Sequence, residues 1–196
     1  MSAISSQDEI MAELIGRYGE LLLNESNDFF ADLASSIVGQ QLSAKAAATI
    51  WNRVKAALGE VNPENVIKTS NETLRSAGLS SQKAEYIKSL ATAAQNKTLE
   101  LDRLRDLENE EIIRQLTAIK GVGRWTAEMF LIFGLARPDV FSFGDGGLFS
   151  AMNKLYGEMT KEKMTEISEK WSPYRSFACL YLWESLDNAP KQQADF

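Results

Sequence analysis

Apolar side chains recur at intervals of three and four residues along most of the chain, which is the spacing that places them on one face of an α-helix. The first such run lies between Ser6 and Leu22, and no stretch shows the alternation typical of a half-buried strand. Serine, aspartate and asparagine precede the runs, and glycine often follows them, as expected at helix ends. The pattern therefore predicts an all-α protein.

Capping residues predict where the helices begin. Starts are expected at Ser6, Asp28, Ser43, Asn62, Ser70, Ser81, Glu108 or Asn109, Arg124, Asp145, Thr160 and Pro173. Gly59, Gly78 and Gly134 are the expected ends of the helices that precede them. The tail from Asn188 is polar and is expected to be loose.

Two glycines separate the apolar runs around residue 120. A run from Ile112 to Ile119 leads into Gly121-Val122-Gly123, and a second apolar helix is expected from Arg124. Glycine supplies the backbone freedom of a tight turn, so the segment predicts a helix, a hairpin and a helix. Backbone N–H groups at the start of the second helix suit a phosphate, although an ordinary interhelical turn also explains a Gly-x-Gly.

Composition narrows the class of protein. Of the 196 residues, 44% are hydrophobic and 24% are charged, as in an ordinary soluble globular protein. The longest apolar run, Met129 to Ala136, is too short to span a bilayer, so a cytoplasmic location without membrane contact is expected. Cys179 is the single cysteine, which excludes an intramolecular disulfide and a four-cysteine iron–sulfur cluster. The chain has no histidine, the commonest general acid–base and metal ligand.

Charge is unevenly distributed along the chain. The net charge of −6 by itself argues against a nucleic acid partner, because phosphate contacts need clustered Lys and Arg. Residues 33–136 hold 13 Lys plus Arg against 11 Asp plus Glu, whereas the remaining residues hold 8 against 16. The central segment is therefore the part suited to a polyanion.

Four segments and one aspartate carry a resemblance to a known family. They are Ile37–Lys45, Gly78–Ala84, Leu116–Ala127, Asp145 and Trp171–Trp183. In this order they resemble the helix-hairpin-helix DNA glycosylase superfamily, and in particular its alkylated-base (3-methyladenine) branch. The resemblance covers roughly residues 30–185, and several motifs in the right order are more specific than any one alone.

The resemblance implies a two-lobed helical fold with a DNA-binding cleft between the lobes. Residues 28–136 would form a central six-helix barrel-like lobe that contains the helix-hairpin-helix at about residues 110–134. Residues 1–27 and 137–196 would form the second lobe from both termini. This division would place Asp145 at the mouth of the cleft.

Asp145 falls at the spacing of the superfamily's essential aspartate. A carboxylate suits hydrolysis of an N-glycosidic bond, because it stabilises the positive charge that develops on the sugar. Asp145 also precedes an apolar helical run, so helix capping is an alternative role that is compatible with catalysis. Gly146 and Gly147 are poor residues for a first helical turn, and they would either leave room for a nucleotide or form a tight turn.

Trp125 and Trp183 match positions that line the base pocket in relatives, where aromatic faces sandwich a flipped base. Met129 stands where relatives have a further aromatic residue. Tryptophans on amphipathic helices are also common core residues, which is the alternative reading. Trp125 takes the place of the lysine that forms a Schiff base in DNA-nicking members, so the resemblance implies a monofunctional enzyme without lyase activity.

The resemblance also implies DNA contacts from three places in the chain. The hairpin supplies Gly121, Val122, Gly123 and Arg124; an earlier helix junction supplies Gln40, Gln41, Ser43 and Lys45; and the loop from Gly78 to Lys83 supplies Leu79, Ser81 and Lys83. In that loop Ser81 is closest to the position of the wedge residue that enters the base stack, and Leu79 is the alternative. Paired glutamines at a helix junction are as often solvated or capping residues.

Backbone carbonyls of Thr117, Ile119 and Val122 align with a monovalent cation site of the superfamily. The resemblance therefore implies a Na⁺ or K⁺ ion at the hairpin, and it implies no other cofactor.

The sequence thus predicts a monofunctional DNA glycosylase for alkylated, cationic purines such as 3-methyladenine and 7-methylguanine, which would begin base excision repair. It would act as a monomer on damaged double-stranded DNA, at the nucleoid of a prokaryote or in the nucleus of a eukaryote. Two alternatives stay open. One is a glycosylase for a deaminated or oxidised base, and the other is a non-catalytic module that recognises DNA structure.

Overall fold

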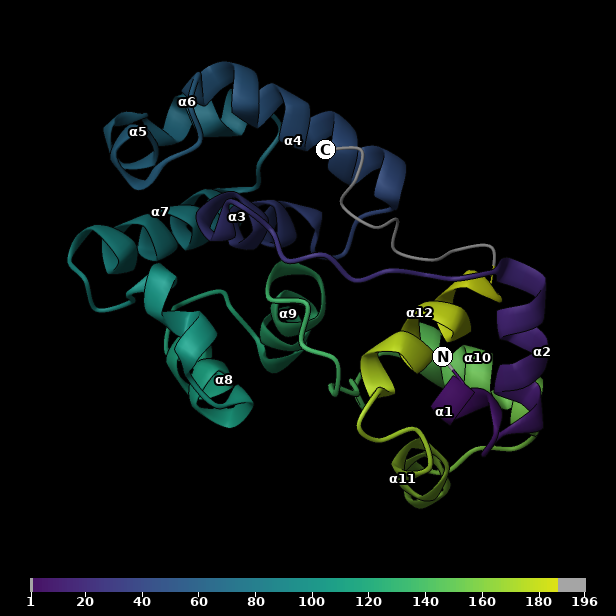
Figure 1. Cartoon of the computed structure of the whole chain (residues 1–196). Coiled ribbons are helices and arrows are strands. Elements are labelled where there is room, and N and C mark those ends of the chain that lie inside the picture. The colour runs from purple at the N-terminus through teal and green to yellow at the C-terminus, as the bar shows by residue number, and fades with distance from the viewer. Residues whose placement is uncertain (1, 187–196) are drawn as a thin grey trace. The chain divides into compact units, whose positions relative to one another are not determined.

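The computed structural model describes residues 2–186, and within this range the chain forms helices and no strand (Figure 1). The prediction of an all-α protein is confirmed. The polar tail from Asn188 lies outside the described residues. No helix in the described part of the chain is long and apolar enough to cross a membrane.

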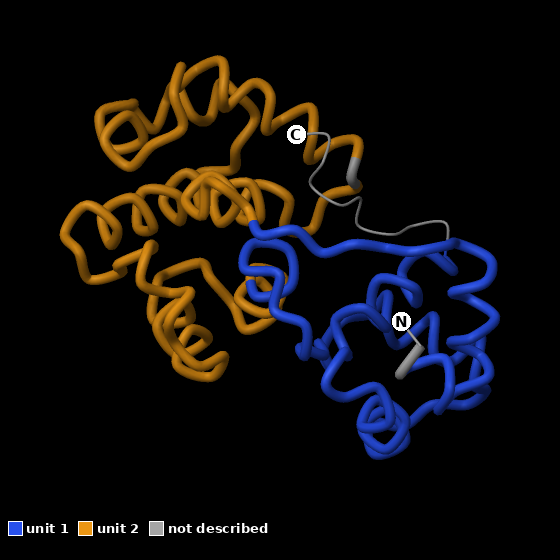
Figure 2. Tube along the Cα trace, viewed as in Figure 1, with its two compact units in different colours: residues 1–25, 131–195 blue, residues 26–130, 196 orange. Residues whose placement is uncertain are grey.

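The chain divides into two compact units, coloured separately in Figure 2. Among the described residues, unit 1 takes 2–25 and 131–186, and unit 2 takes 26–130. Residues 131–136, which the sequence-based division placed in the central lobe, therefore belong to unit 1. They are continuous there with the segment that leads to Asp145.

Unit 2 is built around helix α3 (Phe29–Gly39). The other helices of the unit are α4 (Ala44–Leu58), α5 (Pro63–Lys68), α6 (Asn71–Ser76), α7 (Ser81–Gln95), the 3-10 helix η1 (Leu101–Asp106), α8 (Asn109–Thr117) and α9 (Arg124–Met129). Helix α3 contacts α4, α7, α9 and η1, and its Leu33, Ile37 and Val38 are fully buried. Burial of each such side chain contributes about 1.5–3 kcal/mol, so the apolar face of α3 holds the unit together.

Polar side chains begin most helices of unit 2, as the sequence predicts. Asp28, Ser43, Asn62 and Ser70 each accept a backbone N–H from the first turn of the helix that follows. Ser80 does the same for α7. The helix expected from Arg124 to Gly134 is α-helical only to Met129 and then widens into the π-helical turn η2 (Phe130–Gly134), which starts at the last residue of unit 2.

Unit 1 combines both ends of the chain. It contains α1 (Ser2–Ser5), α2 (Glu9–Tyr18), α10 (Gly146–Tyr156), α11 (Lys161–Glu169) and α12 (Arg175–Glu184). Helix α12 contacts α2 and α10, and it is preceded by the fully buried Trp171. The last helix was expected to begin at Pro173, but it begins two residues later.

The first long helix begins at Glu9 and not at Ser6, because Asp8 is its cap. Asp8 Oδ1 accepts the Met11 N–H at 3.1 Å. Its Oδ2 accepts the Tyr156 hydroxyl at 2.8 Å and the Trp171 indole N–H at 2.9 Å. One carboxylate therefore caps α2 and fastens it to the ends of two other helical segments, which no local pattern around Ser6 reveals.

The carboxyl group of Asp32, in the first turn of α3, is buried where ionisation is unfavourable. Its Oδ2 is buried and has no hydrogen-bond partner among the described residues. Burial raises the pKa of Asp32 to about 6; a bond with Ser26 opposes the rise, and the nearby Asp28 adds to it. The folded protein therefore keeps this proton to a higher pH than the unfolded chain, in which an aspartate titrates near ~3.9. Through this group the free energy of unfolding falls as the pH rises from about 4 to about 6, and it stays lowered above that range.

We expect Asp32→Asn to raise the free energy of unfolding, by more at neutral pH than at about pH 4.5, because only at the higher pH does the wild-type protein bury the charge. Urea unfolding at both pH values measures the difference. Asp102→Asn, at an exposed position of η1, is the matched control. A gain from Asp32→Asn that is equal at both pH values would contradict the assignment.

Candidate active site

Asp145 is the N-cap of α10, and it is almost fully buried, with 8% of its surface exposed. Its Oδ1 accepts the Leu148 backbone N–H at 2.7 Å and the indole N–H of Trp183 at 3.0 Å. Two donors from different helices thus converge on one carboxylate oxygen. Together with the positive end of the α10 dipole they stabilise a negative charge in a fixed orientation.

Gly147 lies against this contact and leaves it room. A Cβ at Gly147 would lie 3.0 Å from Asp145 Oδ1, 3.2 Å from Trp183 Cδ1 and 3.3 Å from Trp183 Nε1. Gly146 differs, because a Cβ there would meet nothing within 4 Å. The two glycines that weaken the start of α10 therefore have separate reasons: Gly147 makes room for the bond between Asp145 and Trp183, and Gly146 leaves the surface beside Asp145 open.

Trp183 has 3% of its surface exposed, and its ring stacks on Phe133 at a centroid distance of 5.6 Å. Its indole is therefore engaged by the carboxylate on its edge and by an aromatic ring on its face. Trp125 and Met129 lie in α9 of unit 2, where Trp125 is 41% exposed and Met129 is buried. The base-pocket roles of all three residues stay predictions, and the anchoring of Asp145 is a role of Trp183 that the sequence did not show.

The segment before Asp145 is fastened to the start of α12. Ser176 donates its backbone N–H to Pro138 O at 3.0 Å, and its Oγ accepts the Val140 N–H at 2.9 Å. Arg175 donates to both oxygens of Asp139, at 2.6 and 2.9 Å. Burial works against ionisation of Asp139, but the bonds from Arg175 outweigh it and hold the pKa of Asp139 below its usual value. Helix α12 thus positions the approach to Asp145 as well as its indole partner.

The hairpin of unit 2 connects α8 to α9. Gly121 has φ 95°, and a Cβ there would lie 2.0 Å from Cγ of Tyr86, so no other residue fits. Gly123 is the N-cap of α9 and supplies no capping side chain; a Cβ there would meet nothing within 4 Å. The predicted helix, hairpin and helix is confirmed, and the space beside the α carbon of Gly123 is open.

Gln40 and Lys83 support this hairpin from within unit 2. Gln40 donates its side-chain amide to Gly121 O at 3.0 Å and to Thr126 Oγ1 at 3.2 Å. Lys83 donates to Val38 O at 2.7 Å and to Gln40 O at 2.6 Å, and partial burial lowers the pKa of its ammonium group. Both were predicted as DNA contacts, which stays a prediction. What the structure adds is a chain of hydrogen bonds from α7 through the end of α3 to the turn.

The remaining residues predicted at the hairpin and the helix junction differ in their partners and in their exposure. Arg124 pairs with Glu110 at 2.7 Å and with Glu128 at 2.9 Å. Ser43 caps α4, and Gln41 is exposed with φ 60°. Lys45 is exposed on α4.

The wedge candidates differ in accessibility. Leu79 is 5% exposed and belongs to the core of unit 2, whereas Ser81 is exposed at the first position of α7. A side chain that enters a base stack must reach solvent, so this arrangement favours Ser81 over Leu79.

The carbonyls of Thr117, Ile119 and Val122 lie around the hairpin turn. The Ile119 oxygen accepts the Val122 N–H at 3.1 Å, which leaves one lone pair for a cation. Neutral carbonyls suit a monovalent ion. Among the described residues no group of three His, Cys, Asp or Glu side chains could hold a metal ion.

The structure thus has a helix-hairpin-helix in unit 2 and a buried, helix-capping aspartate in unit 1. The chain belongs to the HhH-GPD superfamily of base excision DNA repair proteins, whose family model matches residues 34–173.

The chain is similar to several known proteins in structure or in sequence. The crystal structure of a DNA-3-methyladenine glycosidase from Bacillus halodurans is 41% identical, with a TM-score of 0.83 over 93% of this chain and 87% of that one. The Schizosaccharomyces pombe 3-methyladenine DNA glycosylase in complex with abasic DNA is 33% identical, with a TM-score of 0.87 over 94% and 95%. A putative DNA-3-methyladenine glycosylase from Bacillus subtilis is 35% identical over 77% of this chain and 56% of its own length.

The two glycines give a direct test of the Asp145 geometry. Gly146→Ala should raise the free energy of unfolding by about 0.5–1 kcal/mol, because alanine is the better helix former and its methyl group meets open space. Gly147→Ala should gain less than Gly146→Ala, since Trp183 or Asp145 must shift by a few tenths of an ångström to admit its methyl group. Urea denaturation followed by tryptophan fluorescence compares them. Equal stabilisation by both substitutions would show that the contact is looser than described.

Proposed function

We propose that this chain is a monofunctional DNA glycosylase that removes alkylated, cationic purines such as 3-methyladenine and 7-methylguanine from damaged double-stranded DNA. The observation that carries the proposal is the pair of N–H donors that fixes the buried Asp145 carboxylate. Its support is membership of a base excision repair superfamily and similarity to proteins named 3-methyladenine glycosylases.

Asp145 would act on the sugar. Cleavage of the N-glycosidic bond leaves positive charge on the anomeric carbon and its ring oxygen, and a fixed carboxylate nearby lowers the energy of that cation. Water then adds to the anomeric carbon, and its proton is lost to solvent or to the carboxylate. Because Leu148 and Trp183 hold the carboxylate before substrate arrives, little reorganisation is needed as the charge develops.

The preference for cationic bases follows from what the chain lacks. A purine methylated at N3 or N7 is already positively charged, so it departs as a neutral molecule and needs no acid to protonate it. The chain has no histidine to serve as that acid. The exposed ring of Trp125 would attract such a base, with a cation–π contribution of about 0.5–2 kcal/mol.

Trp125 is also the reason why we expect no strand cleavage. It is the second residue of α9, and that helix contains no lysine. Without an amine at this place no Schiff base with the abasic sugar can form there, and β-elimination has no starting point.

The hairpin would hold the DNA backbone. No side chain caps the start of α9, so the hairpin backbone there is open to a phosphate oxygen, with a Na⁺ or K⁺ ion on the neighbouring carbonyls as an added counter-charge. We further propose that the protein acts as a monomer, in the cytoplasm at the nucleoid or in the nucleus.

Asp145→Asn should reduce single-turnover release of 7-methylguanine by at least about 100-fold, because the amide keeps both hydrogen bonds but loses the charge that opposes the sugar cation. Binding to a duplex that carries an abasic analogue should remain. Glu184→Gln, an exposed change of equal charge in α12, is the control. Near-normal excision by Asp145→Asn, with thermal stability unchanged, would remove Asp145 from this role.

A panel of duplexes tests the function itself. Under single-turnover conditions 3-methyladenine and 7-methylguanine should be released faster than hypoxanthine, uracil or 8-oxoguanine, and the product strands should stay intact until alkali is added. Fastest release of a neutral base would favour a glycosylase for another lesion. Binding without any release would favour a non-catalytic module, and nicking without alkali would contradict the monofunctional assignment.

A further inference from the structure

Two adjoining hollows lie along α7 and α8 of unit 2. One of about 550 Å³ is lined by Lys88 and Lys120. The other, of about 630 Å³, is lined by Lys97, Arg103 and Arg114. Thr98, Gln115 and Ala118 line both, so the hollows are parts of one depression, which we name the α7–α8 groove.

The charge of the groove departs from that of the unit around it. Unit 2 holds 13 Lys plus Arg and 13 Asp plus Glu, so its net charge is zero. Five of these cations line the groove, against two carboxylates, Glu100 and Asp106. Both carboxylates line the larger hollow, and none lines the smaller one. The groove is thus a local concentration of positive charge.

The cations of the groove are largely available to a ligand. Three of them form ion pairs, Arg103 with Glu100, Arg114 with Glu111 and Lys120 with Glu85, and every partner has at least 35% of its side-chain surface exposed. Exposed pairs of this kind contribute only about 0–1 kcal/mol, so a phosphate can compete for them. Lys88 and Lys97 form no ion pair within the described part of the chain, and Lys97 is exposed.

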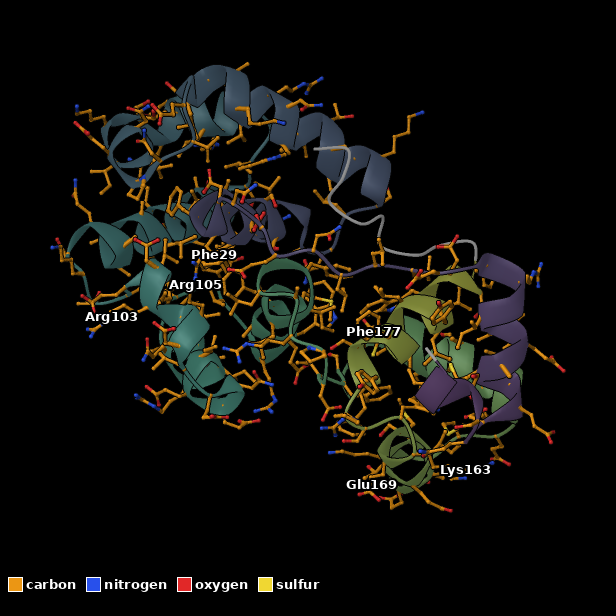
Figure 3. The ribbon with its side chains drawn as sticks, in the orientation of Figure 1. Phe29, Arg103, Arg105, Lys163, Glu169 and Phe177 are labelled. Atoms are coloured by element: carbon orange, nitrogen blue, oxygen red, sulfur yellow. The ribbon has the colours of Figure 1, made fainter. Side chains whose placement is uncertain are left out.

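The position of the groove identifies its ligand. Lys120 directly precedes Gly121 of the hairpin, so the smaller hollow begins where the backbone of DNA is proposed to bind. Arg103, on η1, lines the larger hollow, which does not include Lys120; its side chain is labelled in Figure 3. A cationic groove that tracks a backbone is how single strands are bound.

We propose that the α7–α8 groove binds the phosphates of a single DNA strand that continues past the hairpin. No aromatic residue lines either hollow, so bases have nothing to stack on and the contact is with the backbone, whatever the sequence. The groove would hold the enzyme on lesions beside a gap or an overhang. The proposal rests on the proposed function in taking DNA as the ligand, but it does not depend on base release.

The test compares a blunt duplex carrying an abasic analogue with the same duplex extended by a single-stranded overhang at either end. Wild-type protein should bind one of the extended duplexes more tightly than the blunt one. The double variant Lys88→Gln/Lys97→Gln should lose that gain and keep its affinity for the blunt duplex. Loss of two phosphate contacts to a single strand should also reduce the slope of log K against log salt by about 1.4. Lys161→Gln/Lys170→Gln, two exposed changes in α11 and at its end, is the control of equal charge.

The proposal is overturned if neither overhang improves binding by the wild type, or if the groove variant keeps the improvement. Poly-glutamate provides a further arm. If it binds the wild type but not the groove variant, while neither overhang has an effect, the groove takes an acidic protein segment instead. Release of 7-methylguanine from the blunt duplex is measured in parallel, so that failure of the glycosylase assignment is seen separately.

Discussion

The geometry of the candidate site depends on one carboxylate oxygen that accepts two N–H groups. Asp145 Oδ1 bonds to the amide of Leu148 and to the indole of Trp183. The hydrogen bond from the Leu148 N–H requires α10 to start directly after Asp145. The hydrogen bond from the Trp183 indole requires α12 to lie against that start. Glycine at 147 leaves room for the indole at this place. The hydrogen bonds between Ser176 and residues 138–140 then hold the chain before Asp145 against α12.

A comparable arrangement holds the hairpin of unit 2. The side-chain amide of Gln40 donates to the Gly121 carbonyl and to Thr126, and Lys83 donates to the backbone carbonyl of Gln40. The polar groups that suggested DNA contacts from the sequence are thus partly used to keep a turn in place. A pre-ordered turn binds a phosphate without first losing conformational freedom.

Much of the fold could be predicted from the sequence because it is local. Helical spacing, capping side chains and the glycines of the hairpin act over a few residues, and the structure confirms the all-α class and most helix starts. The partners of Trp183, Gln40 and Asp8 could not be predicted, since each bond joins positions far apart in the chain. A tryptophan on an amphipathic helix gives no local sign that its indole N–H will meet a carboxylate.

The close contact at Gly147 also constrains how relatives can diverge. A side chain at position 147 is accommodated more easily where position 183 carries a smaller residue than tryptophan, because the added Cβ would lie 3.2 Å from the indole. A smaller residue at position 183 that has no hydrogen-bond donor leaves Asp145 with one hydrogen bond fewer. Positions 147 and 183 are therefore expected to change together more often than singly, and substitutions tried singly at 147 or 183 will understate how many sequences can support this site.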